Sequence, residues 1–174
     1  MIVRLRPFAE SDGQLVANWC NDPETTALMA TGREWVTRQD AVGRWGGPHS
    51  FIVVAHAGSW WNDRLAGVIG LYDRERLSEK AELRIMLGLN EARGRGVGTQ
   101  AVQHLVDYGF GALGLWRIYL GTAEANVAAI RCFSKCGFQR EGVLRDDLTR
   151  DGKRFDNVRM ALLRPDWEAL QHGT

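Results

Sequence analysis

The stretch AELRIMLGLNEARGRGVGT, residues 81–99, joins an apolar run typical of a central strand to a loop with glycines at alternate positions. Apolar residues then recur at helical spacing from Ala101 to Val106. The pattern predicts a strand over 81–87, a glycine loop, and an amphipathic helix that starts directly after the loop. This strand–loop–helix unit limits how the rest of the chain can be arranged.

The loop Arg93-Gly94-Arg95-Gly96-Val97-Gly98-Thr99 has the composition of a phosphate-binding turn. Glycines let the backbone turn tightly and approach a ligand closely. The first N–H groups of the following helix point at such a ligand, with the positive end of the helix dipole behind them. The two arginines add positive charge to the rim, so the loop predicts a seat for a pyrophosphate group.

Other glycine loops fit this stretch less well. A P-loop requires a lysine after its last glycine, and here Thr99 follows Gly98. A dinucleotide fingerprint matches only as Gly96, Gly98 and Ala101. The next strand then ends in Gly121-Thr122, without the acidic residue that holds a ribose. A nucleotide-dependent enzyme is therefore disfavoured, while a glycine turn that only packs a helix on a strand stays open.

The flanking segments predict a mixed α+β chain. Alternating or β-branched runs indicate strands, and apolar residues three and four apart indicate helices. Beside the central run, the expected strands cover 2–6, 51–55, 65–71, 116–120, 139–145 and 157–163. Further helices are expected after Ser11-Asp12, over 37–45, and over 125–136 ahead of a left-handed cap at Gly137. A hairpin joins 51–55 to 65–71 with Trp60 and Trp61 near its tip, and a short tail begins at Pro165.

The composition is that of one soluble domain, which we place at residues 1–174. Lys+Arg 22 against Asp+Glu 21 leaves a net charge of +1, so no nucleic-acid partner is expected. Three cysteines without CxxC spacing predict no disulfide framework and no metal site, and Cys132 and Cys136 are expected in the core. Met1-Ile2-Val3-Arg4 does not resemble a signal peptide and no run could span a membrane, so a cytoplasmic location is expected.

Two motifs together carry a resemblance to a known family. Arg93-Gly94-Arg95-Gly96-Val97-Gly98 resembles the Gln/Arg-x-x-Gly-x-Gly/Ala loop of the GNAT N-acetyltransferase superfamily. The segment from Asn126 to Phe138 is similar to that superfamily's later helix, which ends in Lys-x-Gly-Phe. Shorter stretches resemble its ribosomal-protein (N-terminal alanine/serine) branch, which is itself similar to polyamine acetyltransferases: Leu5-Arg6-Pro7, Asn21-Asp22-Pro23, Ala81-Glu82-Leu83 and 156–167.

The resemblance implies a GNAT fold, a mixed, mostly antiparallel sheet of about seven strands flanked by helices, with a splayed central parallel pair. It also implies acetyl-CoA as the acetyl donor, with the pyrophosphate on the loop amides. The pantetheine arm would pair with the backbone of Ile85, Met86 and Leu87, where a backbone N–H near Met86 or Leu87 would polarise the thioester carbonyl. Asn126 would reach the pantetheine, and Lys135 would meet the nucleotide phosphates or remain one more helix-face charge.

Amine acetylation needs a group that takes a proton from the ammonium. Glu82, on the central strand, is the candidate base, and a structural ion pair with Arg84 or Arg117 is the alternative. No Ser/His/Asp or Cys/His constellation presents itself for a covalent intermediate, which favours direct attack of the amine on the thioester.

The donor for the departing thiolate is not where the resemblance would place it. Many members of the superfamily carry a proton-donating tyrosine seven residues after the asparagine, and this chain has Phe133 there. Ser134 or Tyr119 acting through water would replace it, or the thiolate would leave unassisted. Phe133 itself is expected in the core or against the pantetheine.

Two acceptors stay open, a protein N-terminus and a small amine such as a polyamine or an aminoglycoside. A polycation site gathers carboxylates, and Asp12, Asp22, Glu24 and Glu34 belong to the region that, by the resemblance, lines the acceptor cleft. A non-catalytic acyl-CoA-binding sensor is a second class, which the missing tyrosine favours and the candidate base opposes. Seven tryptophans and a free sheet edge are compatible with a homodimer.

Overall fold

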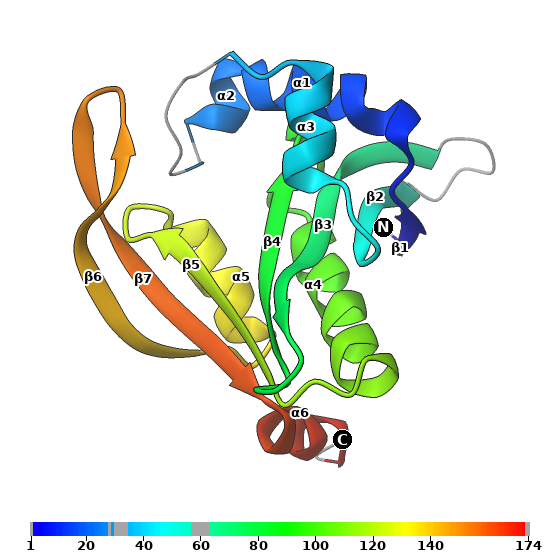
Figure 1. Cartoon of the computed structure of the whole chain (residues 1–174), viewed down its shortest axis with the longest axis vertical. Coiled ribbons are helices and arrows are strands. Elements are labelled where there is room, and N and C mark those ends of the chain that lie inside the picture. The colour runs from blue at the N-terminus through cyan, green and yellow to red at the C-terminus, as the bar shows by residue number, and fades with distance from the viewer. Residues whose placement is uncertain (1, 28, 30–34, 57–62, 173–174) are drawn as a thin grey trace.

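The computed structural model describes residues 2–27, 29, 35–56 and 63–172. Within them, seven strands form one mixed sheet in the order β1-β2-β3-β4-β5-β7-β6 (Figure 1). The strands are β1 (Ile2–Pro7), β2 (Ser50–His56), β3 (Asp63–Glu75), β4 (Lys80–Leu87), β5 (Arg117–Ala123), β6 (Gln139–Arg150) and β7 (Lys153–Leu163). The helices are α1 (Gly13–Asn21), α2 (Pro23–Thr26), α3 (Arg38–Trp45), α4 (Val97–Asp107), α5 (Val127–Lys135) and α6 (Arg164–His172). Shorter helical turns are η1 (Glu10–Asp12), η2 (Asn90–Ala92) and η3 (Tyr108–Ala112).

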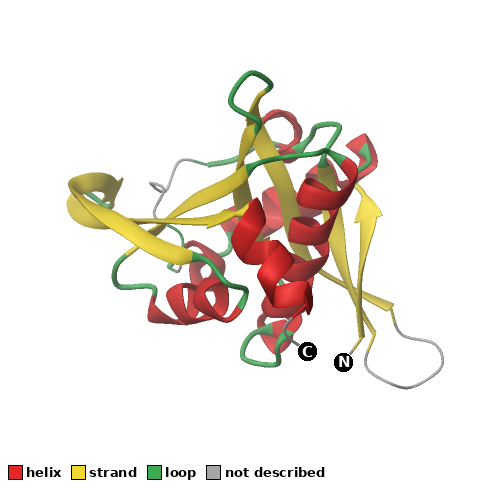
Figure 2. Ribbon diagram, turned by 90° about the horizontal axis from the view of Figure 1, so that it is seen from below, coloured by secondary structure: helices red, strands yellow, loops and turns green. Residues whose placement is uncertain are grey.

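Helices cover both faces of the sheet, and each face has its own apolar cluster (Figures 1 and 2). On one face, buried residues of α4 such as Leu105 pack on Leu83 of β4 and on Phe133 of α5. On the other, Val16 of α1 and residues of α3 pack around Met86 of β4. Side chains of a strand alternate between the two faces of the sheet. Strand β4 therefore supplies both clusters and forms the centre of the molecule.

The central strands β4 and β5 are the one parallel pair in the described sheet, and they stay together only at their beginnings. Their register runs from Lys80↔Arg117 to Glu82↔Tyr119 and goes no further. Beyond that point β4 continues beside β3, and β5 continues beside β7. The two strands therefore diverge toward their carboxyl ends, and the edge of β4 from Leu83 onward faces a gap in the sheet.

The strand–loop–helix unit and most flanking elements are confirmed, as is the mixed, mostly antiparallel sheet with a splayed parallel pair. Thr37 caps α3 reciprocally with Asp40, and Gly137 adopts φ +90° after α5, as expected for a left-handed cap. Three expectations were incomplete. Strands β6 and β7 form a longer hairpin, β3 extends to Glu75, and the expected tail is the helix α6. The predicted hairpin tip with Trp60 and Trp61 lies outside the described residues.

Candidate functional site

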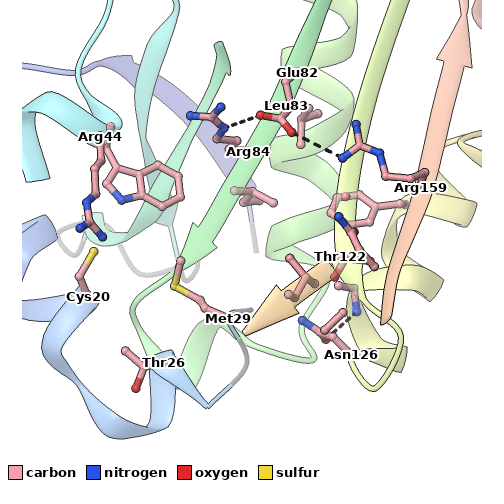
Figure 3. A pocket seen from close by; sticks show the side chains of 18 of the residues that line it. Cys20, Thr26, Met29, Arg44, Glu82, Leu83, Arg84, Thr122, Asn126 and Arg159 are labelled. Carbon is pink, nitrogen blue, oxygen red and sulfur yellow. Dashed lines mark hydrogen bonds and ion pairs between the residues drawn. The ribbon is translucent and has the colours of Figure 1, made fainter. Parts of the chain in front are cut away.

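A cavity of about 410 Å³ opens where β4 and β5 diverge (Figure 3). Elements from both halves of the chain line it, so its walls come together only in the folded protein. One wall belongs to β4, β5 and α5: Glu82, Leu83, Arg84, Ile85, Gly121, Thr122, Ala123, Asn126, Ala129 and Phe133. The other described lining residues come from the α1–α3 region and from the β6–β7 hairpin: Cys20, Thr26, Met29, Val36, Arg44, Trp45, Leu148, Asn157 and Arg159.

The glycine loop lies at the N-terminus of α4, outside the lining of this cavity. Gly96 is the N-cap of α4 with φ +79°, and Gly94 has φ +70°, left-handed conformations that glycine adopts without strain. A Cβ on Gly94 would meet no atom within 4 Å, and one on Gly96 would meet only the end of Gln100 at 4.0 Å. The space above the first turn of α4 is therefore open, which fits an anion held by backbone N–H groups.

The packing of Gly98 joins the loop to the diverging strands. A Cβ there would lie 3.5 Å from Leu87 of β4 and 3.7 Å from the sulfur of Cys132 on α5. The loop is thus pressed between the end of β4 and α5. A ligand with phosphates at α4 and an arm running along β4 would follow one continuous surface into the cavity.

The basic residues expected to contact the phosphates of the donor differ in the contacts they make. Arg93 Nη2 donates to Leu87 O at 2.8 Å and to Thr25 Oγ1 at 2.9 Å, so this side chain ties the end of β4 to α2. Arg95 is exposed on the loop, and Lys135 is exposed at the end of α5. Neither lines the cavity. The structure thus gives Arg93 a structural task and leaves Arg95 and Lys135 at the surface.

Backbone alternation along β4 indicates which groups face the gap. Gly88 N donates to Ala66 O, next to the antiparallel pair Val68↔Met86. Alternate residues of such a ladder point their N–H and C=O groups at the same neighbour, so those of Met86 are directed at β3. The groups of Ile85 and Leu87 are then directed at the gap. Of the two backbone donors expected for the thioester carbonyl, this geometry favours Leu87.

Asn126 and Phe133 both lie on the cavity wall, at the beginning and near the end of α5. The Asn126 side chain accepts a hydrogen bond from Ala129 N at 3.2 Å and so caps the helix. Phe133 is 6% exposed, and its ring centroid lies 6.0 Å from that of Phe138. Phe133 therefore belongs to the core and lines the cavity at once, and its ring offers no proton. Ser134, one of its expected substitutes, is exposed and does not line the cavity.

Glu82 lies at the last paired position of the parallel strands, between two arginines (Figure 3). Arg84 Nε donates to Glu82 Oε2 at 2.6 Å. Arg159 Nη1 lies 4.0 Å from Oε1, an ion-pair distance that is too long for a hydrogen bond. The expected structural pair thus forms with Arg84, while Arg117 pairs with Glu141 instead. One oxygen of Glu82 is oriented by this pair, and the other faces Arg159, which also lines the cavity.

The carboxylates expected for a polycation site do not converge on the cavity. Asp12 accepts from both terminal nitrogens of Arg6, at 3.0 and 2.8 Å, and from Ala9 N. Burial opposes its ionisation, but these hydrogen bonds prevail and hold the pKa of Asp12 below its usual value. Asp22 caps α2 through Thr25, and Glu24 accepts from Asn90.

None of these three carboxylates lines the cavity, and Glu34 lies outside the described residues. The described lining instead carries three arginines, Arg44, Arg84 and Arg159, against the single carboxylate of Glu82. Within the described lining, basic side chains therefore outnumber acidic ones, although Asp73 and Asp147 pair with the lining residues Arg84 and Asn157.

Sequence reasoning missed several residues that line the cavity. Asn157 and Arg159 stand two apart on β7, and strand alternation places them on one face, but no motif marks them. Cys20 also lines the cavity, and burial raises the pKa of its thiol. Cys132 and Cys136 pack against Thr99 at the start of α4, with Cys136 in the apolar core. Among the described residues, no group of three or more potential ligands is placed to hold a metal.

The splayed parallel strands, with an open helix N-terminus beside them, define the class of fold that binds acyl-CoA. A family model described as an acetyltransferase (GNAT) domain matches residues 3–139. The chain belongs to the GNAT acetyltransferase family. It is accordingly an N-acetyltransferase that takes its acetyl group from acetyl-CoA and acts on amines. No described helix has the length and apolar character needed to cross a membrane.

Relatives match this chain over nearly all of its length or over about two thirds of it. The uncharacterized N-acetyltransferase p20 of Bacillus licheniformis is 27% identical over 94% of this chain and 93% of its own length. The putative ribosomal N-acetyltransferase YdaF of Bacillus subtilis is 27% identical over 95% of this chain and 87% of its own. The spermidine N(1)-acetyltransferase of Escherichia coli K12 is 31% identical over 63% of this chain and 58% of its own.

A solved structure shares the fold. The spermidine N-acetyltransferase of Vibrio cholerae, crystallised in complex with CoA and spermine, superposes with a TM-score of 0.81. It is 22% identical, and the match covers 95% of this chain and 98% of that one. The relatives thus include a ribosomal and a polyamine type, and they leave the acceptor of this chain unassigned.

Proposed function

We propose that this chain transfers the acetyl group directly to a single primary amine, bound in the cavity where β4 and β5 diverge. The observation that carries the proposal is the position of that cavity. It reaches from the edge of β4, beside the glycine loop, to the open face of β7. A donor arm entering along β4 and an amine entering from β7 would meet there, which is the proximity that direct transfer requires.

The residues on the β4 side would hold the donor. The amides at the start of α4, from Val97 to Thr99, would accept the pyrophosphate, with Gly94 and Gly96 leaving room for it. The gap-facing backbone of Ile85 and the N–H of Leu87, whose carbonyl already accepts from Arg93, would pair with the pantetheine arm. Asn126 would meet the same arm from α5, and Arg95 and Lys135 would approach the phosphates from the rim. The Vibrio cholerae relative was solved with CoA, which supports this assignment.

The residues around the gap would stabilise the charge that develops on the thioester oxygen and accept the proton that the amine loses. Acetyl-CoA supplies a thioester, whose C–S bond breaks as the amine nitrogen forms a C–N bond. Leu87 N–H would donate to the thioester oxygen, where negative charge develops. Glu82 Oε1 would take the proton that the amine nitrogen loses, while Arg84 holds the other oxygen in place. The electron pair of the C–S bond leaves with sulfur, and a proton from water yields free CoA.

The charges of the wall restrict the acceptor. Three arginines and one glutamate in the described lining would repel a molecule with several positive charges, and the carboxylates of η1 and of the α2 region are engaged elsewhere. The excess of arginines in the described lining, and the engagement of Asp12, Asp22 and Glu24 elsewhere, support an acceptor with one amine, such as a protein N-terminus or a small monoamine. They stand against a polyamine or an aminoglycoside.

The test is thiol release from acetyl-CoA across matched amines, with a control that lacks acceptor. The panel holds Ala- and Ser-initiated peptides, free amino acids, spermidine and an aminoglycoside, and CoA affinity is measured separately. We expect turnover with monoamines and at least about tenfold lower kcat/KM with the polycations, since each misplaced charge costs on the order of 1 kcal/mol or more. Preference for spermidine would refute the proposed acceptor class, and silence across the panel with CoA bound would refute direct transfer to these amines.

A further inference from the structure

Asn157, on β7, carries a buried hydrogen-bond acceptor without a donor. The residue is 5% exposed and lines the cavity, and none of the described residues donates to its Oδ1. Its Nδ2 donates to Asp147 Oδ2 at 2.8 Å. Because a carboxylate only accepts, this bond fixes which end of the amide faces the cavity. A buried acceptor left unpaired is costly, so its persistence in a cavity wall points to an N–H of a ligand.

Arg159 lies beside this acceptor. Both residues pair with β5, at Ala123↔Asn157 and Gly121↔Arg159, and both side chains fold over Gly121. A Cβ on Gly121 would lie 2.7 Å from Asn157 Oδ1 and 2.8 Å from Arg159 Nη1. The unpaired acceptor and the guanidinium are therefore close neighbours, and both side chains occupy the space that a side chain at position 121 would fill.

Arg159 also has donors to spare. It lies over the ring of Tyr119, 5.5 Å from its centroid, and its ion pair with Glu82 spans 4.0 Å. Toward the other described residues it donates no hydrogen bond, although a guanidinium carries five N–H groups. Arg117, on the neighbouring strand, shows the contrast, because its two terminal nitrogens both donate to Glu141. Arg159 is the arginine of this face that can still form a paired contact with an acid.

We propose that Asn157 and Arg159 bind an acceptor whose amine is joined to a carboxylate a few bonds away, the grouping of a free amino acid. This inference rests on the proposed function and specifies its substrate. One N–H of the amine would donate to Asn157 Oδ1, which leaves the nitrogen lone pair for the thioester. The carboxylate would accept from Arg159, with Arg84 and Arg44 adding positive charge to the same cavity.

The experiment compares each free L-amino acid with its carboxamide in the thiol-release assay, together with Asp-, Glu- and Ala-initiated peptides. The amide keeps the amine and removes only the negative charge. We expect the best amino acid to exceed its amide by about ten- to a hundredfold in kcat/KM, the range of a hydrogen bond to a charged group. Calorimetry of the same pair with the CoA-bound protein gives a second reading that is independent of turnover.

Variants assign the effect to the two residues. Arg159→Gln should bring the ratio of acid to amide close to one, and Arg159→Lys should restore part of it. Asn157→Leu should raise the KM of acid and amide alike without changing CoA affinity. Arg140→Gln is the matched control, since Arg140 pairs with Glu124 outside the cavity lining and should keep the full ratio.

The outcomes separate this inference from the function beneath it. Amides or Ala-initiated peptides accepted as well as free acids would overturn the acidic acceptor and leave direct transfer intact. Asp- or Glu-initiated peptides accepted in place of free amino acids would support the same chemistry with the carboxylate supplied by a side chain. Loss of CoA affinity in Asn157→Leu, with an unchanged acceptor KM, would show that Asn157 binds CoA and not the acceptor, which would refute its proposed role. No turnover with any amine would instead count against the proposed function.

Discussion

The proposed site has two walls built from different kinds of groups: a backbone wall, formed by the edge of β4 and by the glycine loop that lies next to the cavity, and a side-chain wall on β7. On the β4–α4 side the available groups belong to the backbone: the edge of a strand, the first turn of a helix, and glycines that leave space around both. On the β7 side they belong to side chains, chiefly Asn157 and Arg159, which meet above Gly121. Substitution changes side chains and leaves backbone groups in place. The fold can therefore keep one donor while the acceptor varies from one relative to another.

Glu82 stands at the junction of these walls, and its replacement should have the largest effect. Glu82→Gln keeps the shape of the side chain and removes the site that would take the proton. We expect kcat to fall by about 10²–10³-fold, the usual contribution of a general base, with little change in the Kd of CoA. The pH dependence of kcat/KM should change shape as well. Stopped assays over pH and fluorescence titration with CoA measure the two effects.

Glu141→Gln is the control for that variant. Glu141 is also a glutamate paired with an arginine, but it lies outside the cavity lining. It should keep nearly full activity. If Glu82→Gln retained full turnover as well, Glu82 would be a structural partner of Arg84, and the junction would lose its proposed base.

A change in the backbone wall should separate donor from acceptor. Gly96→Val places a β-branched residue at φ +79° and puts its side chain in the open space above α4. We expect the Kd of CoA to rise by about 30–100-fold, equivalent to roughly 2–3 kcal/mol, because the new side chain obstructs the approach of the phosphates. The acceptor KM, measured at saturating acetyl-CoA, should change far less. Calorimetry with CoA gives the first value and the thiol assay the second.

Gly114→Val controls for backbone strain alone. Gly114 has φ +66° and open space around it, and it lies outside both walls. The Gly114→Val variant should unfold at a lower urea concentration than the unsubstituted protein, as Gly96→Val does, but it should bind CoA normally. Equal CoA affinity in the two variants would show that the loop is only a turn, the alternative that the sequence left open.

The backbone wall could be predicted from the sequence because glycines and helical periodicity mark it directly. The side-chain wall could not be predicted, because Asn157 and Arg159 are distant in sequence from Gly121. They are brought next to it only by the pairing of β7 with β5. The lengths of β6 and β7 were underestimated for a related reason. Most of β6 is exposed on both faces, so its sequence does not alternate between apolar and polar residues. The partners of Asp12 and Glu82 were likewise a matter of geometry, although Arg84 was one of the arginines expected for Glu82.

The smallest expected effect concerns Phe133, which lies on the backbone side and belongs to the core. Phe133→Tyr would supply the hydroxyl that the family resemblance leads one to expect seven residues after Asn126. A thiol with a pKa near ~8.5 is already a tolerable leaving group, so we expect kcat at neutral pH to change by less than about threefold. A rise of tenfold or more would show that protonation of the thiolate limits turnover. The step that limits turnover would then be protonation of the leaving thiolate, which this chain performs without the tyrosine that many relatives of the superfamily use.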